Sequence, residues 1–306
     1  MRLAVRRLLA VATTLTLAAT ALAACSGGGG GADTVTLVTH DSFVISKPVR
    51  RAFEASTGLK LRIVKSGDAG AALNQAILTA DHPLGDAFFG VDNTLLSRAL
   101  TSKVFARYTP MAAREIPAEF VIDPSHHVTS VDYGDVCVNY DRAYFADGEE
   151  RAIPQTLDDL AQPQFAKLLV VENPSTSSTG LAFMLASIAR FGEDGWRDWW
   201  AQLRDGGVQV VDGWEQAYNT EFSGSAGKGA YPLVVSYATS PPAEVIYADP
   251  RPSSAPTGNL DRTCFRQIET VGVLRNAEHP AAARRDRKST RLNSSHVSES
   301  RMPSSA

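Results

Sequence analysis

The most informative sequence in this chain reads VQVVDGWEQAYNTEF, residues 208–222, and then LVVSYATSPP, residues 233–242. The first part contains the turn signal Asp212-Gly213 directly before an aromatic segment. Helical spacing places Trp214, Tyr218 and Phe222 on one side of a short helix. This pattern therefore predicts a turn followed by a helix over residues 214–222 with an aromatic face.

The second part predicts a buried strand over residues 233–237, because apolar and β-forming residues follow one another there between turn signals. The strand is expected to end in the loop 238–242. Aromatic rings beside small hydroxyl groups at loop edges suit a flat organic ligand, which needs stacking faces and a few fixed hydrogen bonds. The alternative is that Trp214 and Tyr237 are core residues.

Outward from this stretch, short strands and helices alternate along the chain. Strands are expected at residues 34–39, 59–64, 87–91, 128–140, 168–171, 209–211 and 267–274. Helices are expected at 48–57, where Gly58 ends the helix, at 71–79, from 94, from 156, and at 181–191, 196–203 and 280–285. Such alternation over short loops indicates a parallel sheet covered on both faces, so we predict an α/β fold.

The composition is that of an ordinary soluble protein. The 306 residues are 44% hydrophobic with a net charge of -3, which is enough chain for two lobes around separate cores. Basic residues are dispersed, so a nucleic-acid partner is not expected. His126 and His127 are adjacent and cannot easily converge on one ion, so we predict no metal site and no cofactor.

Both ends of the chain are expected to lie outside the fold. Residues 1–24 predict a secretory signal peptide, because arginines precede an apolar run that ends in small residues. The run is too short and wrongly flanked for a stable membrane span. Residues 286–306 are rich in serine and arginine, lack apolar periodicity and resemble a translated sequencing adapter, so we interpret them as a non-native tail. A disordered tail is the alternative.

The end of the signal peptide, Leu22-Ala23-Ala24-Cys25, resembles a bacterial lipobox. The resemblance implies cleavage before Cys25, acylation of its thiol and an extracytoplasmic protein held at the membrane by a lipid alone. The glycine-rich residues 25–33 would then be a flexible tether. The alternative is a soluble secreted protein that is cut nearby.

Five polar or glycine-rich loops follow predicted strands, and ligands of open parallel sheets lie beyond the carboxyl ends of the strands. The loops are His40-Asp41-Ser42, Gly67-Asp68, Asp92-Asn93, Ser177-Ser178-Thr179 and Tyr237 to Ser240. Three aspartates around one cleft would favour a cationic ligand, although each of them could instead cap a helix. Hydroxyls at the start of the helix after Gly180 suit an anion, although simple capping by Ser178 or Thr179 needs no ligand.

The cysteines and serines give little support for nucleophilic catalysis. No Gly-x-Ser-x-Gly motif occurs, and Cys137 lies within a predicted strand, where a nucleophile would be poorly placed. Once Cys25 is acylated, Cys137 and Cys264 remain. An even pair in an exported chain predicts a disulfide between them.

A family resemblance becomes visible when the motifs are taken in order. They are His40-Asp41-Ser42-Phe43, Gly90 to Leu96, Asp132-Tyr133-Gly134, Asn173-Pro174 to Gly180, Gly213 to Tyr218 and Ser236 to Pro241. Over residues 34–274 the chain resembles the thiamine-binding solute-binding proteins of bacterial ABC importers. The resemblance implies a two-lobe, type II periplasmic-binding fold with a cleft that closes on thiamine or its phosphates, and an importer permease as partner.

The resemblance also implies a domain order and a set of ligand-binding residues. Lobe 1 would span residues 34–130 and 256–285, and lobe 2 would span 131–255. Trp214 and Tyr237 would line the cleft, Asp68, Ser177 and Ser178 would hold phosphate or hydroxyethyl oxygens, and His40 would replace a tyrosine of enterobacterial relatives. With the strand-end loops, the candidate ligand-binding residues are His40, Asp41, Ser42, Asp68, Asp92, Ser177, Ser178, Trp214, Tyr218, Tyr237 and Ser240.

Part of the family's aromatic cage is missing. A family tryptophan has no counterpart near Lys47, and a family tyrosine appears as Ala243. Two other functions therefore stay open beside a non-enzymatic thiamine receptor. One is a receptor for another small solute, such as ferric ion or a polyamine, and the other is a thiamine-cleaving enzyme on the same architecture.

Overall fold

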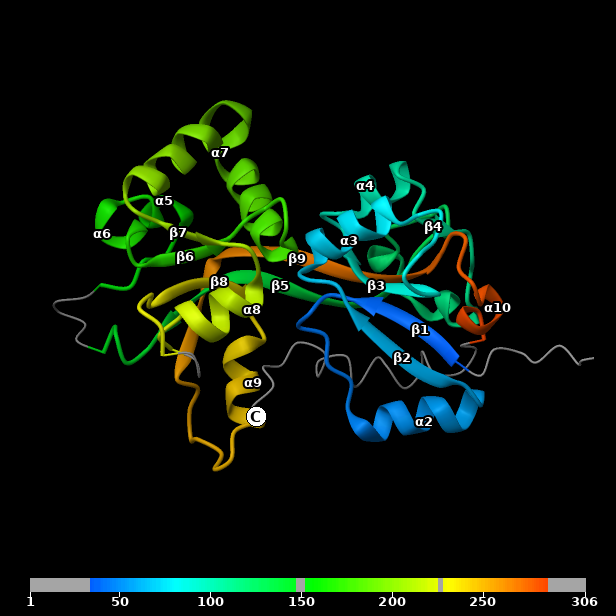
Figure 1. Ribbon diagram of the computed structural model, residues 1–306. Coiled ribbons are helices and arrows are strands. Elements are labelled where there is room, and N and C mark those ends of the chain that lie inside the picture. The colour runs from blue at the N-terminus through cyan, green and yellow to red at the C-terminus, as the bar shows by residue number, and fades with distance from the viewer. Residues whose placement is uncertain (1–33, 147–151, 225–227, 286–306) are drawn as a thin grey trace, which may run out of the picture. The chain divides into compact units, whose positions relative to one another are not determined.

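The computed structural model describes residues 34–146, 152–224 and 228–285 (Figure 1). The expected signal peptide, the lipid-anchored segment at Cys25 and the expected tail 286–306 lie outside these residues. Strands and helices alternate through most of the described chain, as the sequence predicts. None of the helices formed by these residues is long and apolar enough to cross a membrane.

Three parallel strands begin the fold: β1 (Thr34–Thr39), β2 (Lys60–Lys65) and β3 (Ala87–Asp92), with β1 between the other two. Helix α2 (Lys47–Thr57) lies on one side of them, and α3 (Ala69–Leu78) and α4 (Leu96–Thr101) lie on the other (Figure 1). α2 ends at Gly58, whose φ of 70° is left-handed. Glycine adopts this conformation at little cost, and the predicted helix end is confirmed.

Two long strands, β5 (Thr129–Asp141) and β9 (Thr257–Leu274), pair antiparallel along most of their length. β9 also pairs antiparallel with β3 and with the short β4 (Phe105–Ala106), and β5 pairs antiparallel with β8 (Leu233–Tyr237). Two short 3-10 helices, Met111–Glu115 and Ala118–Phe120, lie between β4 and β5. The expectation of a wholly parallel sheet is therefore wrong, because the two long strands return against their neighbours without a helical crossover.

The sheet continues as β8-β6-β7, with β6 (Leu169–Glu172) parallel to both β8 and β7 (Gln209–Val211). In Figure 1, α5 (Leu157–Leu160), α6 (Pro163–Ala166) and α7 (Ser178–Asp205) lie on one side of these strands, and α8 (Trp214–Gln216) lies on the other. α7 is interrupted at Gly192, with φ 71°, between the two helical segments that the sequence predicts.

The aromatic segment is helical, as predicted, but its second half is a π-helical turn, Ala217–Glu221. The expectation of a loop over 238–242 is partly wrong, because α9 (Ser240–Ile246) begins within it. Its first turn holds Pro241 and Pro242, where a missing N–H costs little. The last helix described is α10 (Pro280–Ala283).

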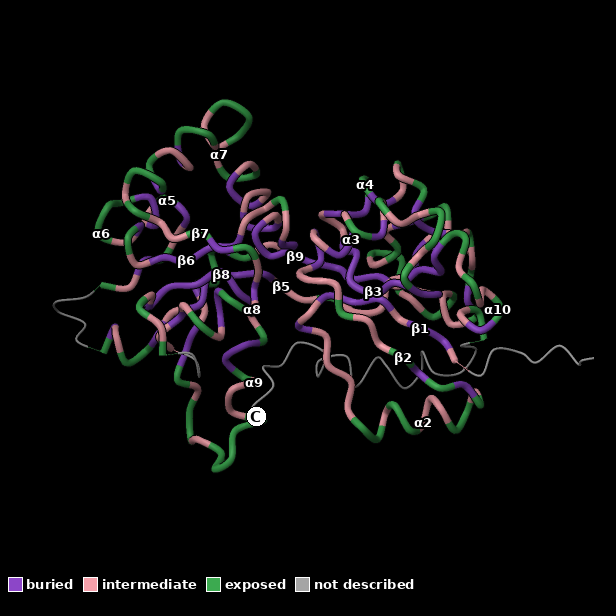
Figure 2. The backbone as a smooth tube through the Cα atoms, in the orientation of Figure 1, coloured by how far each residue is buried: buried purple, intermediate pink, exposed green. Residues whose placement is uncertain are grey.

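The described chain contains two hydrophobic cores. The first includes Val38, Leu73, Phe88, Val91 and Phe105, and we call the part of the chain around it the first lobe. The second includes Val138, Leu160, Phe183, Trp214 and Leu233, and we call its surroundings the second lobe. In Figure 2 the strands are mostly buried, while the outer sides of the helices are exposed. β9 contributes Leu260 to the second core and Leu274 to the first, and the domain boundaries at 130 and 255 stay predictions.

The predicted disulfide is present between Cys137 and Cys264, with an S–S distance of 2.05 Å. It joins β5 to β9 where their register is irregular, since Val136 faces Phe265 but Val138 faces Leu260. The two strands that contribute to the sheet of both lobes are therefore covalently linked. Both cysteines of the described residues are bonded, so neither of them is a free thiol.

Candidate functional site

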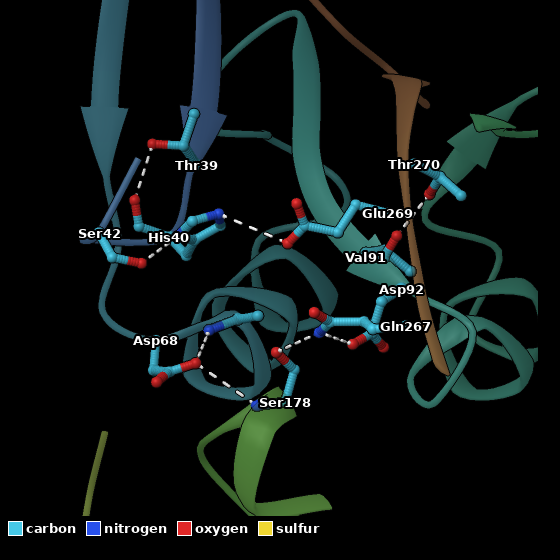
Figure 3. Close-up of polar contacts among 11 residues, drawn as sticks. Thr39, His40, Ser42, Asp68, Val91, Asp92, Ser178, Gln267, Glu269 and Thr270 are labelled. Atoms are coloured by element: carbon cyan, nitrogen blue, oxygen red, sulfur yellow. Dashed lines mark hydrogen bonds and ion pairs between the residues drawn. The ribbon is translucent and has the colours of Figure 1, made fainter. Parts of the chain in front are cut away.

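The polar side chains that follow the strands make separate sets of polar contacts, one around Asp68 and Gln267 and one around His40 (Figure 3). Asp68 begins helix α3 by accepting a hydrogen bond of 2.6 Å from the amide of Ala69. The same carboxylate accepts a bond of 2.8 Å from the amide of Trp214 and a longer one, 3.4 Å, from the amide of Ser178. Asp68 therefore joins the first lobe to two segments of the second lobe.

Gln267 of β9 extends this set to the end of β3. Its side-chain amide donates to the carboxylate of Asp92 and, over 3.1 Å, to the hydroxyl of Ser178 (Figure 3). Asp92 also accepts from the amides of Thr94, at 2.9 Å, and Leu95, at 3.1 Å, so it caps the turn after the strand. Burial raises the pKa of Asp92 to about 6, because the charged carboxylate loses its hydration.

His40, directly after β1, lies between a hydroxyl and a carboxylate. Its Nδ1 is 2.8 Å from Oγ of Ser42, and its Nε2 is 3.8 Å from Oε1 of Glu269 on β9. His40 and Glu269 are 4% and 1% exposed, so both act away from bulk water. The imidazole packs over Gly90, where a Cβ would come within 2.6 Å of His40 Cδ2. Glycine is therefore required opposite this histidine.

The aromatic side chains predicted from residues 208–242 form a row. Trp214 stacks on Tyr218 with ring centroids 5.0 Å apart, and Tyr237 is tilted against Trp214 at 5.7 Å. The indole Nε1 of Trp214 donates to Oγ of Ser236 over 2.8 Å, and this hydroxyl lies 3.0 Å from Oγ of Ser240. All three rings are buried and belong to the second core. The burial of the rings agrees with their interpretation as core residues, and the hydroxyls beside them agree with their interpretation as a ligand-binding surface.

The loop before α7 holds its hydroxyls at the first turn of the helix. Ser177 is the N-cap, and its Oγ accepts from the amide of Gly180 at 3.5 Å and lies 2.9 Å from Oγ1 of Thr179. Behind this turn lies Glu172, the last residue of β6, which is fully buried. Burial, and then the charge of Asp68, raise the pKa of Glu172 well above its ordinary value. The helix is therefore capped by Ser177, and the expectation that Ser178 or Thr179 is the cap is wrong.

The half-buried carboxyl group of Glu244 supports the aromatic row. Glu244 of α9 accepts a hydrogen bond from the hydroxyl of Tyr218 and another, of 2.6 Å, from the hydroxyl of Thr257. Burial raises the pKa of Glu244 to about 7, with a small further rise from Asp141. Glu244 therefore anchors Tyr218 and α9 to the start of β9.

The structure brings ten of the eleven predicted residues into contact with another member of the site. Asp41 differs, because its backbone amide donates to the carbonyl of Gly67 over 2.9 Å, while no hydrogen bond of its carboxylate to another described residue is observed. Sequence reasoning missed Glu172, Glu244, Gln267 and Glu269. The signal for two of these was present, because Gln267 and Glu269 alternate with apolar residues in the predicted strand 267–274 and so share one face. Glu244 gave no such signal.

The described residues contain no group of three or more histidines, cysteines or acids that could hold a metal ion. The nearest approach to a catalytic arrangement is the Ser42–His40–Glu269 set. Ser42 is buried, and with Cys137 in a disulfide that cysteine offers no nucleophile. The rings, hydroxyls and carboxylates of the candidate site are groups that can bind and orient a solute.

Comparison with known proteins gives the family to which the chain is similar. Residues 83–245 match the family described as bacterial extracellular solute-binding protein. The chain is 27% identical over 256 residues to a thiamine-binding periplasmic protein of Escherichia coli (strain K12), covering 82% of this chain and 73% of the relative. It is 30% identical over 218 residues to the protein of that name in Brucella suis biovar 1, covering 68% of this chain and 60% of the relative.

A solved structure gives the same result at the level of the fold. The periplasmic thiamin binding protein superposes with a TM-score of 0.69 and 25% sequence identity, covering 86% of this chain and 80% of that one. The predicted type II periplasmic-binding architecture is therefore confirmed.

Proposed function

We propose a ligand and a mode of action from one premise: the chain belongs to the bacterial extracellular solute-binding proteins. The proposed ligand is thiamine, which the chain would capture outside the cytoplasm and deliver to the permease of an ABC importer. The relatives from Escherichia coli and Brucella suis carry the name thiamine-binding periplasmic protein. By this proposal the protein binds and releases its ligand without chemical change.

The observation that best supports thiamine is the aromatic row beside hydroxyls and carboxylates. Trp214 belongs to the row, donates through its indole to Ser236 and donates through its amide to Asp68. Thiamine offers an aromatic aminopyrimidine for stacking and a positively charged thiazolium. Stacking rings and nearby carboxylates are the groups that such a ligand requires.

The proposed mechanism is closure of the two lobes around the ligand. The lobes are joined by hydrogen bonds at Asp68 and by β5 and β9, which continue from one lobe to the other. The ligand favours the closed state only by its differential affinity for the two states. Thiamine that contacts both Trp214 and the Asp68 loop would bind the closed state more tightly than the open state.

Calorimetric titration tests the ligand directly. We expect thiamine to bind with one site per chain and to change tryptophan fluorescence, because Trp214 lies in the proposed site. Spermidine and ferric citrate, titrated in parallel, should give no saturable heat. Binding of either of them in place of thiamine would reject the proposal. Thiamine recovered after prolonged incubation should be intact, and a cleaved product would instead favour the enzyme.

We further infer that the exported protein is a lipoprotein anchored through Cys25, from the lipobox-like sequence before it. Expressed in a bacterium, the full chain should partition with the membrane. The Cys25→Ser variant should partition with the soluble fraction, because it lacks the thiol that carries the lipid. Equal partitioning of the two proteins would refute the anchor. An anchor of this kind would hold the receptor near its permease.

A further inference from the structure

The start of helix α3 contacts the second lobe through its backbone. Gly70, the second residue of the helix, is buried against the turn that precedes α7. A Cβ on Gly70 would lie 2.7 Å from both the carbonyl carbon and the carbonyl oxygen of Thr176, which is too close for any side chain. Only glycine therefore allows α3 and this turn to lie together at the observed distance.

A hydrogen bond between the backbones of the two lobes accompanies this close contact. The first amides of a helix have no acceptor within the helix, and Ala71 is the third residue of α3. Its amide donates instead to the carbonyl of Thr176 over 2.9 Å. Both groups would need another hydrogen-bond partner if the lobes moved apart.

Asp68 joins the same end of α3 to the second lobe by two further hydrogen bonds. Its carboxylate accepts from the amide of Trp214 over 2.8 Å and, as Figure 3 shows, from that of Ser178 over 3.4 Å. A Cβ on Gly213 would lie 3.2 Å from Cβ of Asp68, so the second lobe also approaches closely through a glycine. All these contacts are made between protein atoms, so they favour the closed arrangement of the lobes independently of a ligand.

We propose that residues 68–71 form a latch, which holds the two lobes together against residues 176–178 and 213–214 before a ligand binds. Gly70 is the positioning residue that permits this contact. The cleft opens transiently to admit a ligand, and a bound ligand is retained because the latch must part before it leaves. The inference rests on the proposed function only for the identity of the ligand, since the latch itself consists of protein atoms.

Gly70→Ala should weaken the latch without weakening helix α3. Alanine favours a helix more than glycine does, and the added methyl group meets the backbone of Thr176 only while the lobes are closed. The variant should therefore stay folded and release thiamine faster in stopped-flow fluorescence. Its affinity should fall roughly 5-fold to 150-fold, which is the usual cost of one overpacked contact expressed as an equilibrium constant.

Gly195→Ala is the matched control, because Gly195 also lies within a helix and a Cβ there would contact Cβ of Phe191 in α7 itself, at 3.3 Å. This variant should bind and release thiamine as the wild type does.

Two measurements on the full chain need no ligand. In small-angle X-ray scattering, Gly70→Ala should have a larger radius of gyration than the wild type and Gly195→Ala. In the wild type, the amide of Ala71 should exchange its hydrogen at least roughly tenfold more slowly than that of Val49. Val49 is also the third residue of its helix, α2, but its amide donates to the hydroxyl of Ser46 within its own lobe, over 3.5 Å.

The outcomes separate the latch from the proposed function. Equal radii of gyration for Gly70→Ala and the wild type, or equally fast exchange at Ala71 and Val49, would overturn the latch even if thiamine binds. An equal loss of affinity in Gly195→Ala would overturn it as well. Expected scattering and exchange without any thiamine binding would reject the proposed ligand and support the latch. If Gly70→Ala does not fold, hydrogen exchange in the wild type decides.

Discussion

Replacing Trp214 with alanine is expected to lower the free energy of unfolding by about 3 to 5 kcal/mol, the usual cost of truncating a buried aromatic residue. Trp214 is 2% exposed and stacks on Tyr218. In protein that remains folded, loss of a stacking ring should weaken thiamine binding by roughly 0.5 to 1.5 kcal/mol beyond the buried area, and a cationic ligand adds to this. Tyr237→Ala should also lower the free energy of unfolding and weaken thiamine binding, because the ring of Tyr237 contacts Trp214.

A matched control separates the two effects. Trp199 is also buried in the second core, stacks on Phe191 and donates through its indole to the carbonyl of Leu157 over 2.9 Å. Trp199→Ala should therefore lose similar stability while binding thiamine as the wild type does. Chemical denaturation and calorimetry on the same proteins, below their unfolding transitions, give both quantities. Normal binding by folded Trp214→Ala and Tyr237→Ala would refute their assignment to the site.

Removal of the disulfide should have the second large effect. The bond between Cys137 and Cys264 spans a sequence separation of 127 residues. Cross-links of this length restrict the unfolded chain strongly, so the double variant Cys137→Ala/Cys264→Ala should be less stable by about 2 to 5 kcal/mol. The two cysteines also join the strands that both lobes share, so loss of the bond should destabilise both lobes.

Denaturant unfolding of the wild type with and without reductant measures this effect independently. Reductant should shift the wild-type midpoint toward that of the double variant and leave the double variant unchanged. The double variant should still bind thiamine when folded, because neither cysteine contacts the candidate ligand-binding residues in an observed hydrogen bond. Equal midpoints for oxidised wild type and double variant would contradict a stabilising disulfide.

The sequence alone determined the local elements with good accuracy. β1 and β8 coincide with the predicted strands, and α2 ends at the predicted Gly58, since alternation, apolar runs and glycine act over a few residues. It also indicated that the loops after β1, β2 and β3 share one edge, because a parallel arrangement of these three strands follows from their alternation with helices. The disulfide followed from the number of cysteines in an exported chain.

Only the tertiary structure decided what surrounds each candidate residue. Gln267 bonds to Asp92, 175 residues away, and to Ser178, 89 residues away, and no local pattern encodes such partners. The antiparallel return of β9 places Glu269 against His40, which the expectation of a parallel sheet could not provide. The raised pKa values of Glu172 and Glu244 likewise depend on loss of water through packing. The charge balance of the site is therefore a property of the folded chain, because electrostatic interactions depend on distances in space and on loss of water.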